Sequence, residues 1–144
     1  MNSRATTVAL TLLPAVVASL GYYMLLGHRR DYIGHFAAGY GGTLALIAIA
    51  LAAVPPVRHP KLAGWVVVPC TLLAIAAGTV TEATIFNIAK FDEVDYCNQN
   101  LGAVLAGLVA VHLVRPAKPP DADFRWALLN GVTFVLIGGY FALT

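Results

Sequence analysis

The sequence predicts an all-α protein, a polytopic bundle of five transmembrane helices, and three observations carry this prediction. First, 59% of the residues are hydrophobic and 11% are charged, whereas soluble domains average roughly 45–50% apolar and about 25% charged residues. Second, the apolar residues form five runs, each near the roughly 20 residues that cross a bilayer. Third, most charged residues lie in short segments between these runs. A soluble fold could not bury so much apolar surface.

The first expected span is the most ambiguous, because it resembles a secretory signal peptide. Arg4 precedes an apolar core, and residues 17–19 resemble a small-residue cleavage site. Since the apolar run continues past that site, we expect a retained helix in which Pro14 is tolerated. The five spans of this single domain, which covers residues 1–144, are 8–26, 33–54, 65–89, 97–114 and 126–143.

Segments rich in proline and charge separate the spans. Residues 27–31 (GHRRD) form a short polar break, and residues 55–64 (PPVRHPKLAG) read as a turn with three prolines. Residues 115–125 (RPAKPPDADFR) form a charged linker before the last span.

Small residues in the second and fourth spans predict close helix packing. In lipid, small side chains let helix backbones approach, and such contacts are a main source of cohesion. A phosphate-binding glycine loop would follow a strand, so packing is the simpler interpretation of GYGG. The expected packing residues are Gly39, Gly41, Gly42, Gly102, Ala103 and Gly107.

The basic residues predict the orientation. Six of them (Arg4, Arg58, Lys61, Arg115, Lys118, Arg125) fall on one side and three (Arg29, Arg30, Lys90) on the other. The positive-inside rule then puts the amino terminus in the cytoplasm and the carboxyl terminus outside. We expect a multi-pass protein of a bacterial cytoplasmic membrane. The formal charge of +2 is too small and too scattered for a nucleic-acid partner.

Polar residues gather at the expected outer face. Four of the seven acidic residues, Glu82, Asp92, Glu93 and Asp95, fall within one short stretch. Asp31 and His35 are spaced i, i+4, so the aspartate either orients the imidazole or only favours the helix start. Glu82 is either an interfacial acid or a buried one facing the bundle interior, where an acid is expensive unless paired. The candidate ligand-binding residues are Asp31, His35, Glu82, Asp95 and Gln99.

Cysteine and histidine placement argues against cofactors. Cys70 and Cys97 fall near opposite ends of the bundle, so a disulfide between them is not expected. The chain has no CxxC or mixed Cys/His motif, and its histidines do not form an axial pair at one depth. We therefore expect no metal, no haem and no other cofactor.

Two sequence segments, together with Glu82, resemble a known family. The segments DYIGHFAAGY and DEVDYCNQNLGAVLAG are similar to the pattern of VanZ-like membrane proteins over Asp31 to Gly107. By this resemblance Asp31, His35, Glu82, Asp92, Asp95 and Gly102 take the motif positions. Gln99 stands where the pattern has Asn. The resemblance implies a site connected with cell-envelope lipids or glycopeptide-antibiotic resistance, without a defined reaction.

The sequence is compatible with three functions. The first is a non-catalytic protein whose outward-facing polar pocket binds a lipid headgroup or envelope ligand. The second is an accessory subunit packed against a larger respiratory, photosynthetic or transport complex. The third is a membrane enzyme that uses His35 with Glu82 or Asp95 as acid and base. We favour the first, with membrane lipids as partners.

Overall fold

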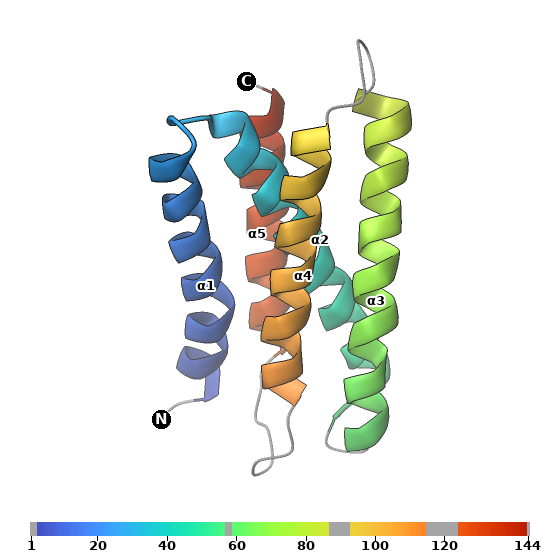
Figure 1. Ribbon diagram of the computed structural model, residues 1–144. Helices are drawn as coiled ribbons and strands as arrows, with labels where there is room; N and C mark the ends of the chain where they lie inside the picture. The colour runs from blue at the N-terminus through green and yellow to red at the C-terminus, as the bar shows by residue number, and fades with distance from the viewer. Residues whose placement is uncertain (1–2, 57–58, 87–92, 115–123, 144) are drawn as a thin grey trace.

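The computed structural model describes residues 3–56, 59–86, 93–114 and 124–143. Its regular structure in these ranges is entirely helical, as predicted. Five of the helices are long and apolar enough to cross a membrane, which fits a multi-pass membrane protein. The elements are α1 (Ser3–Leu25), α2 (Arg30–Ala53), α3 (Pro60–Thr81), the π-helical turn η1 (Glu82–Phe86), α4 (Glu93–Val114) and α5 (Phe124–Leu143). Figure 1 shows the five long helices side by side, with the chain turning at the two ends of the bundle.

The expected turn over residues 55–64 is wrong in its second half, because α3 begins at Pro60 rather than at Trp65. Proline is well suited to the first helical position, where a backbone N–H would have no intrahelical acceptor. The third span was expected to reach Ala89. In the structure, α3 gives way to η1 at Glu82, and residues 87–92 lie outside the described ranges.

A tight turn reverses the chain between α1 and α2. Gly27 and His28 both have φ of 67°, in the left-handed region. The His28 N–H donates to the Tyr23 carbonyl at 3.0 Å, and the Leu26 N–H donates to the Tyr22 carbonyl at 2.9 Å. These bonds satisfy carbonyls at the end of α1, as helix-terminating glycine motifs do. Gly27 and His28 therefore form an ordered helix cap, whereas Arg30 and Asp31 of the expected break already belong to α2, which begins three residues earlier than expected.

The central element of the bundle is α2. It packs against all four other long helices, most extensively against α5 and α4. Figure 1 shows it crossing behind α4. Tyr40, at 0% exposure, is its largest fully buried side chain. By contrast, most residues of α1 and α3 are not buried. Burial is thus concentrated in α2 and α4.

Glycines bring α2 and α5 into backbone contact. A Cβ atom built on Gly34 would lie 2.5 Å from the Ala142 nitrogen and 2.8 Å from the Gly138 carbonyl oxygen. One built on Gly131 would lie 2.8 Å from both the Ala45 nitrogen and the Gly41 carbonyl oxygen. Real Cβ atoms do not approach backbone this closely, so glycine is required at these crossing points.

The packing residues expected from sequence divide into two groups. Gly39, Gly41 and Gly102 each face backbone atoms of a neighbouring helix at less than ordinary contact distance, and Gly107 faces the Thr71 side chain. Ala103 is buried at 2% exposure. Gly42 differs: a Cβ there would meet only the Val135 Cγ2 atom at 4.0 Å, an ordinary contact.

Hydrogen bonds fix α1 to the rest of the bundle. The buried Tyr40 hydroxyl donates to the Thr11 carbonyl oxygen at 2.6 Å. The Asn130 Nδ2 donates to the Thr11 hydroxyl at 2.7 Å, and that hydroxyl donates to the Thr7 carbonyl at 2.8 Å. Thr11 therefore ties α1 to both α2 and α5.

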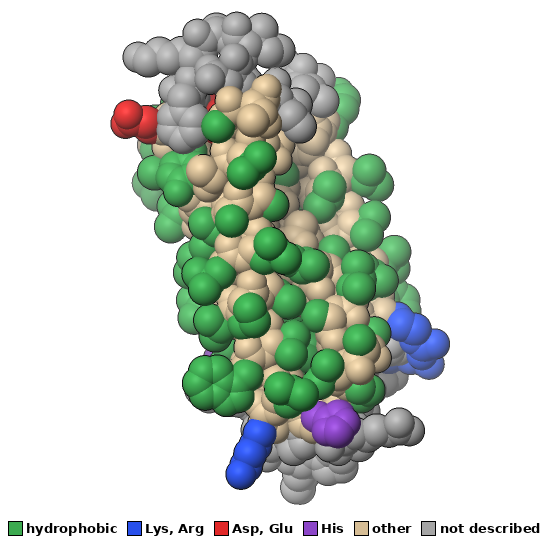
Figure 2. Space-filling model, turned by 90° about the vertical axis from the view of Figure 1, so that its right-hand side faces the viewer, with side chains coloured by type: hydrophobic (Ala, Val, Ile, Leu, Met, Phe, Trp, Pro, Cys, Tyr) green, Lys and Arg blue, Asp and Glu red, His purple; other side chains and the backbone are tan. Residues whose placement is uncertain are grey.

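On the outer surface, apolar and charged side chains occupy different levels of the bundle. Figure 2 shows hydrophobic side chains over the middle of one face, with acidic, basic and histidine side chains toward its ends. On α3, Trp65 is 74% exposed, Leu72 61% and Val80 60%. So much exposed apolar surface in water would favour aggregation, whereas in lipid it is the expected exterior.

Candidate functional site

The candidate residues come from three helices that meet at one end of the bundle. His35 lies in the second turn of α2, Glu82 at the junction of α3 and η1, and Asp95 and Gln99 in the first two turns of α4. Because α2 and α4 begin where α3 ends, these residues lie at the same end of the bundle, the upper end in Figure 1. We call His35, Glu82, Asp95 and Gln99 the polar cluster.

An imidazole–carboxylate pair joins α2 to α4 within this cluster. The His35 Nε2 atom lies 3.4 Å from Asp95 Oδ2, with the two side chains 10% and 18% exposed. Backbone contact between Gly39 and Gln99, one turn further along both helices, holds the pair at this separation. The pair is an ion pair when the imidazole is protonated.

Asp31 has a different partner from the one its spacing indicated. Its carboxylate accepts hydrogen bonds from the Arg29 guanidinium, including one from Nε to Oδ1 at 2.9 Å. This contact raises the pKa of Arg29 above its usual range. The guanidinium also lies over the Tyr32 ring, 4.3 Å from the ring centre. Asp31 therefore belongs to an exposed rim, and the carboxylate beside His35 is that of Asp95.

Glu82 faces the interior rather than the surface. The residue is 3% exposed, and its Oε2 atom has no hydrogen-bond partner in the part of the chain that the structure describes. Its backbone N–H is shared between the Gly78 and Thr79 carbonyls, where the helix changes to π-type hydrogen bonding. Single π-helical turns are frequent at functional sites, because they re-aim a side chain.

Gln99 sets the relative positions of α3 and α4. A Cβ at Gly78 would collide with the Gln99 Nε2 atom, so the amide of Gln99 lies against the backbone of α3. Because the two helices are antiparallel, the next turn of α3, at Glu82, lies level with the preceding turn of α4, at Asp95. Glu82 and Asp95 thus lie at the same level of the bundle.

Two cavities lie in this half of the bundle, one of them lined by Gln99 of the polar cluster. One of about 480 Å³ lies between α2, α3 and α4, and its polar lining includes Thr43, Thr81 and Gln99. The other, about 560 Å³, lies between α1 and α4 and is lined by Tyr22 and Asn98 among apolar side chains. Both volumes are in the usual range for small-molecule sites.

Three further buried polar groups lie on α2 and α4 and were not predicted as site residues. Thr43 Oγ1, Asn98 Nδ2 and Asn100 Oδ1 have no hydrogen-bond partner among the described residues. Asn98 is 4% exposed and Thr43 is 0% exposed. For Asn98, the available signal was its spacing of three residues from Asp95, which puts it near the same helix face.

The cluster offers acid, amide and imidazole groups and few other chemistries. Among the described residues, no three His, Cys, Asp or Glu side chains form a group that could hold a metal ion. Cys70 and Cys97 are both free thiols, as their separation predicted, and Cys97 is exposed.

Comparison of the chain with protein-family models, curated proteins and solved structures finds no match. The similarity to VanZ-like proteins therefore remains a prediction, and function has to be argued from the geometry.

Proposed function

We propose that this protein is a non-catalytic multi-pass membrane protein that binds the polar headgroup of a lipid or cell-envelope ligand at the polar cluster. The five apolar helices and their exposed apolar middle support membrane insertion. The described basic residues support the orientation: Arg4, Lys61 and Arg125 start helices at one end, and Arg29 and Arg30 lie at the other. The positive-inside rule puts the polar cluster on the outer face.

The observation that carries the binding proposal is the environment of Glu82. A buried polar group without a hydrogen bond costs about 1–3 kcal/mol, so proteins rarely keep one unless another molecule completes it. Here the carboxyl of Glu82 is buried with Oε2 unpartnered within the described residues. Gln99, which contacts α3 one turn from Glu82, lines a cavity between α2, α3 and α4. A bound ligand would remove this cost.

The composition of the cluster indicates what such a ligand presents. Glu82 and Asp95 supply acceptor oxygens, and the amide of Gln99 supplies both donors and acceptors. Carboxylates bind ammonium and hydroxyl donors well and repel phosphate. We therefore propose an amine-bearing or polyhydroxylated headgroup, with its apolar tail along the exposed helix faces.

A second candidate is acid–base catalysis, which the His35–Asp95 contact favours. A carboxylate beside an imidazole orients the ring and stabilises its protonated form, the arrangement that a general acid or base needs. A binding protein should release its ligand unchanged, whereas an enzyme would leave a product, so the chemical identity of the bound molecule distinguishes them.

The experiment is purification in mild detergent followed by mass spectrometry of the bound lipids and proteins, comparing Glu82→Gln with Glu93→Gln. Both substitutions remove one carboxylate at the same end of the bundle, but Glu93 is exposed. We expect Glu82→Gln to lower ligand retention about tenfold, the effect of losing one charged hydrogen bond of about 1.5 kcal/mol. Glu93→Gln should retain the ligand.

The stability of the Glu82→Gln variant distinguishes a binding role of Glu82 from a structural one. Because one Glu82 oxygen has no partner among the described residues, Glu82→Gln should not lower the stability of the ligand-free protein. Lower stability with unchanged lipid retention would show that Glu82 only holds helices together. A stoichiometric protein partner, with no enriched lipid, would support the accessory-subunit hypothesis instead.

A further inference from the structure

The cavity between α2, α3 and α4 extends from the level of the polar cluster toward the middle of the bundle. Its volume is about 480 Å³, and it is lined by residues within 38–46 of α2, residues within 73–81 of α3, and Gln99 of α4. Figure 1 shows α2 and α3 diverging toward the upper end, with α4 between them. Gln99 packs against Gly39 and Gly78, so the cavity begins at its level. Each helical stretch is roughly 12 Å long, at about 1.5 Å per residue.

Thr43 of α2, one of the residues that line this cavity, lacks a hydrogen bond that other threonines of the chain make. Helical threonines commonly donate their hydroxyl to a carbonyl one turn earlier. The Thr43 hydroxyl is completely buried and has no partner among the described residues. Its donor is therefore available to a molecule in the cavity. The described threonines that do donate to the carbonyl four residues earlier are Thr11, Thr71, Thr79, Thr81, Thr84 and Thr133.

The lining of the cavity fits a hydrocarbon chain that carries a carbonyl group near its upper end. None of the described lining residues is charged, and those deeper than Thr43 are apolar. Thr43 follows Gly39 by four residues, which puts it roughly 6 Å deeper along α2. In a diacyl lipid the ester carbonyls lie just below the headgroup, and the chains continue from them. Leu73, at the deep end, is 59% exposed, so a chain can pass from the cavity into the bilayer core.

We propose that this cavity holds one ester-linked acyl chain of the lipid whose headgroup binds the polar cluster, and that the Thr43 hydroxyl donates a hydrogen bond to the ester carbonyl. The inference rests on the proposed function and makes its ligand more specific. The uncharged lining and the carboxylates of Glu82 and Asp95 favour a sugar headgroup over a phosphate. The ligand class is then a glycosyl diacylglycerol.

A comparison of ester-linked with ether-linked lipid tests the Thr43 contact. The full-length protein in mild detergent is mixed with equal amounts of two synthetic glucosyl glycerolipids that differ only in this linkage, and native mass spectrometry measures the lipid-bound species. The ether lacks the carbonyl acceptor. We expect the ester to be retained about fivefold more, the ordinary effect of one neutral hydrogen bond.

Threonine variants identify the donor. Thr43→Val replaces the hydroxyl with a methyl group and should abolish the preference for the ester. It should not lower the stability of the lipid-free protein, because the hydroxyl has no partner among the described residues. Thr79→Val is the matched control, since the Thr79 hydroxyl is bound to the Ile75 carbonyl and Thr79 does not line the cavity. It should keep the preference.

Alanine variants on α3 test the position of the chain. Ala74 lines the cavity, whereas Ala76 is exposed and does not line it. Ala74→Phe should therefore weaken the retention of both lipids, because the ring occupies space that the chain needs. Ala76→Phe should retain both.

The outcomes separate this inference from the headgroup proposal. Glu82→Gln should weaken both lipids and keep the ester preference. Equal retention of ester and ether by the unaltered protein, with both lost in Glu82→Gln, would refute only the Thr43 contact. An ester preference that needs Thr43 but not Glu82 would support the cavity site and refute the headgroup site. Equal retention by Ala74→Phe and Ala76→Phe would overturn the position of the chain, and retention of neither lipid by the unaltered protein would overturn both proposals.

Discussion

Gly138→Ala should weaken the packing of α2 against α5 more than a single methyl group would suggest. A Cβ at position 138 would lie 2.5 Å from the Ala38 nitrogen and 2.7 Å from the Gly34 carbonyl oxygen. Both atoms belong to the backbone of α2, which cannot move aside as a side chain can. The two helices must therefore separate by close to 1 Å to restore an ordinary contact, and this separation loosens the contacts along their interface.

The neighbouring residue supplies a matched control. Gly139 is in the same helix, but a Cβ there would meet nothing within 4 Å. Alanine favours helix over glycine by about 1 kcal/mol, and this term is common to both variants. Overpacking a close contact typically costs about 1–3 kcal/mol. We therefore expect Gly138→Ala to be less stable than Gly139→Ala by about 1–3 kcal/mol, and Gly139→Ala to equal or exceed the unaltered protein.

The measurement is reversible unfolding of the purified protein in mixed micelles with increasing denaturing detergent, followed by circular dichroism. The difference between the two midpoints, multiplied by the slope of the transition, gives the difference in the free energy of unfolding. If Gly138→Ala were as stable as Gly139→Ala, the backbone contact between α2 and α5 described here would be wrong.

Two further predictions address the attachment of α1 and the topology. Tyr40→Phe removes the hydroxyl that donates to the Thr11 carbonyl, so it should lower the free energy of unfolding by about 1 kcal/mol in the same detergent titration; an unchanged midpoint would argue against that bond. Cys97, an exposed thiol near the start of α4 at the end proposed to be the outer one, should react with a membrane-impermeant maleimide in intact cells, with Cys97→Ser as the unlabelled control. Labelling of Cys97 only after the membrane is opened would reverse the proposed orientation.

The number and type of elements were predictable because membrane-length apolar runs carry a strong signal. The helix boundaries were less predictable, and Pro60 shows the reason. A cluster of three prolines indicates a turn, but only the geometry of the chain decides which proline ends one helix and which begins the next. The pairing of α2 with α5 could not be predicted, since helical periodicity does not say which glycine, such as Gly34 or Gly138, faces which helix.

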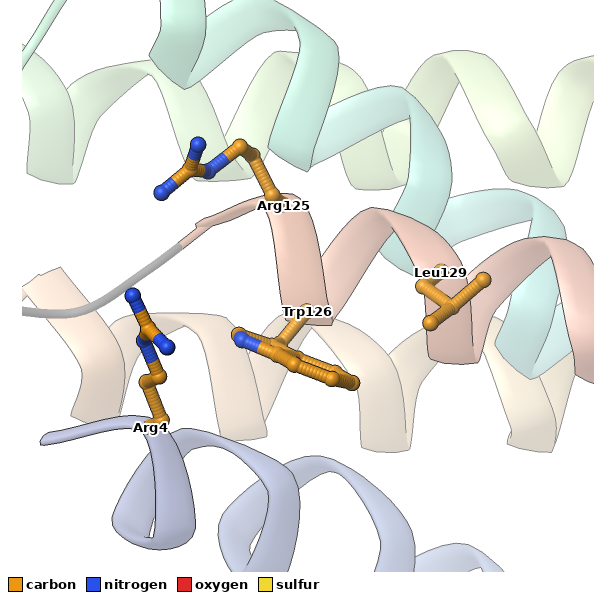
Figure 3. A pocket seen from close by; sticks show the side chains of 4 residues that line it. All are labelled: Arg4, Arg125, Trp126 and Leu129. Carbon is orange, nitrogen blue, oxygen red and sulfur yellow. The ribbon is translucent and has the colours of Figure 1, made fainter. Parts of the chain in front are cut away.

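The candidate site was predictable in its location and less so in its contacts. Loop charges and span order were enough to expect His35, Glu82 and Asp95 at one end of the bundle. The partner of His35 was not predictable. Asp31 was plausible because it is close to His35 along the chain, and Asp95 because the expected topology puts it at the same end of the bundle. In the structure, Arg29 holds Asp31 on the exposed rim, so Asp95 is the carboxylate beside His35. The convergence of Arg4 and Arg125 on one cavity (Figure 3) was missed because both were counted as loop charges and not paired in space.

The dependence of α2 on α5 has a consequence for how the protein is made. Gly34 is synthesised roughly 100 residues before its contact Gly138, which is about 5–20 s at ordinary rates of translation. During that interval α2 has already left the ribosome while the helix that covers its glycine face does not yet exist. If the helices insert into a membrane as proposed, the early ones must be retained there, or protected by the insertion machinery, until the last one arrives. Nascent chains truncated before residue 124 should consequently be favoured substrates for membrane proteases.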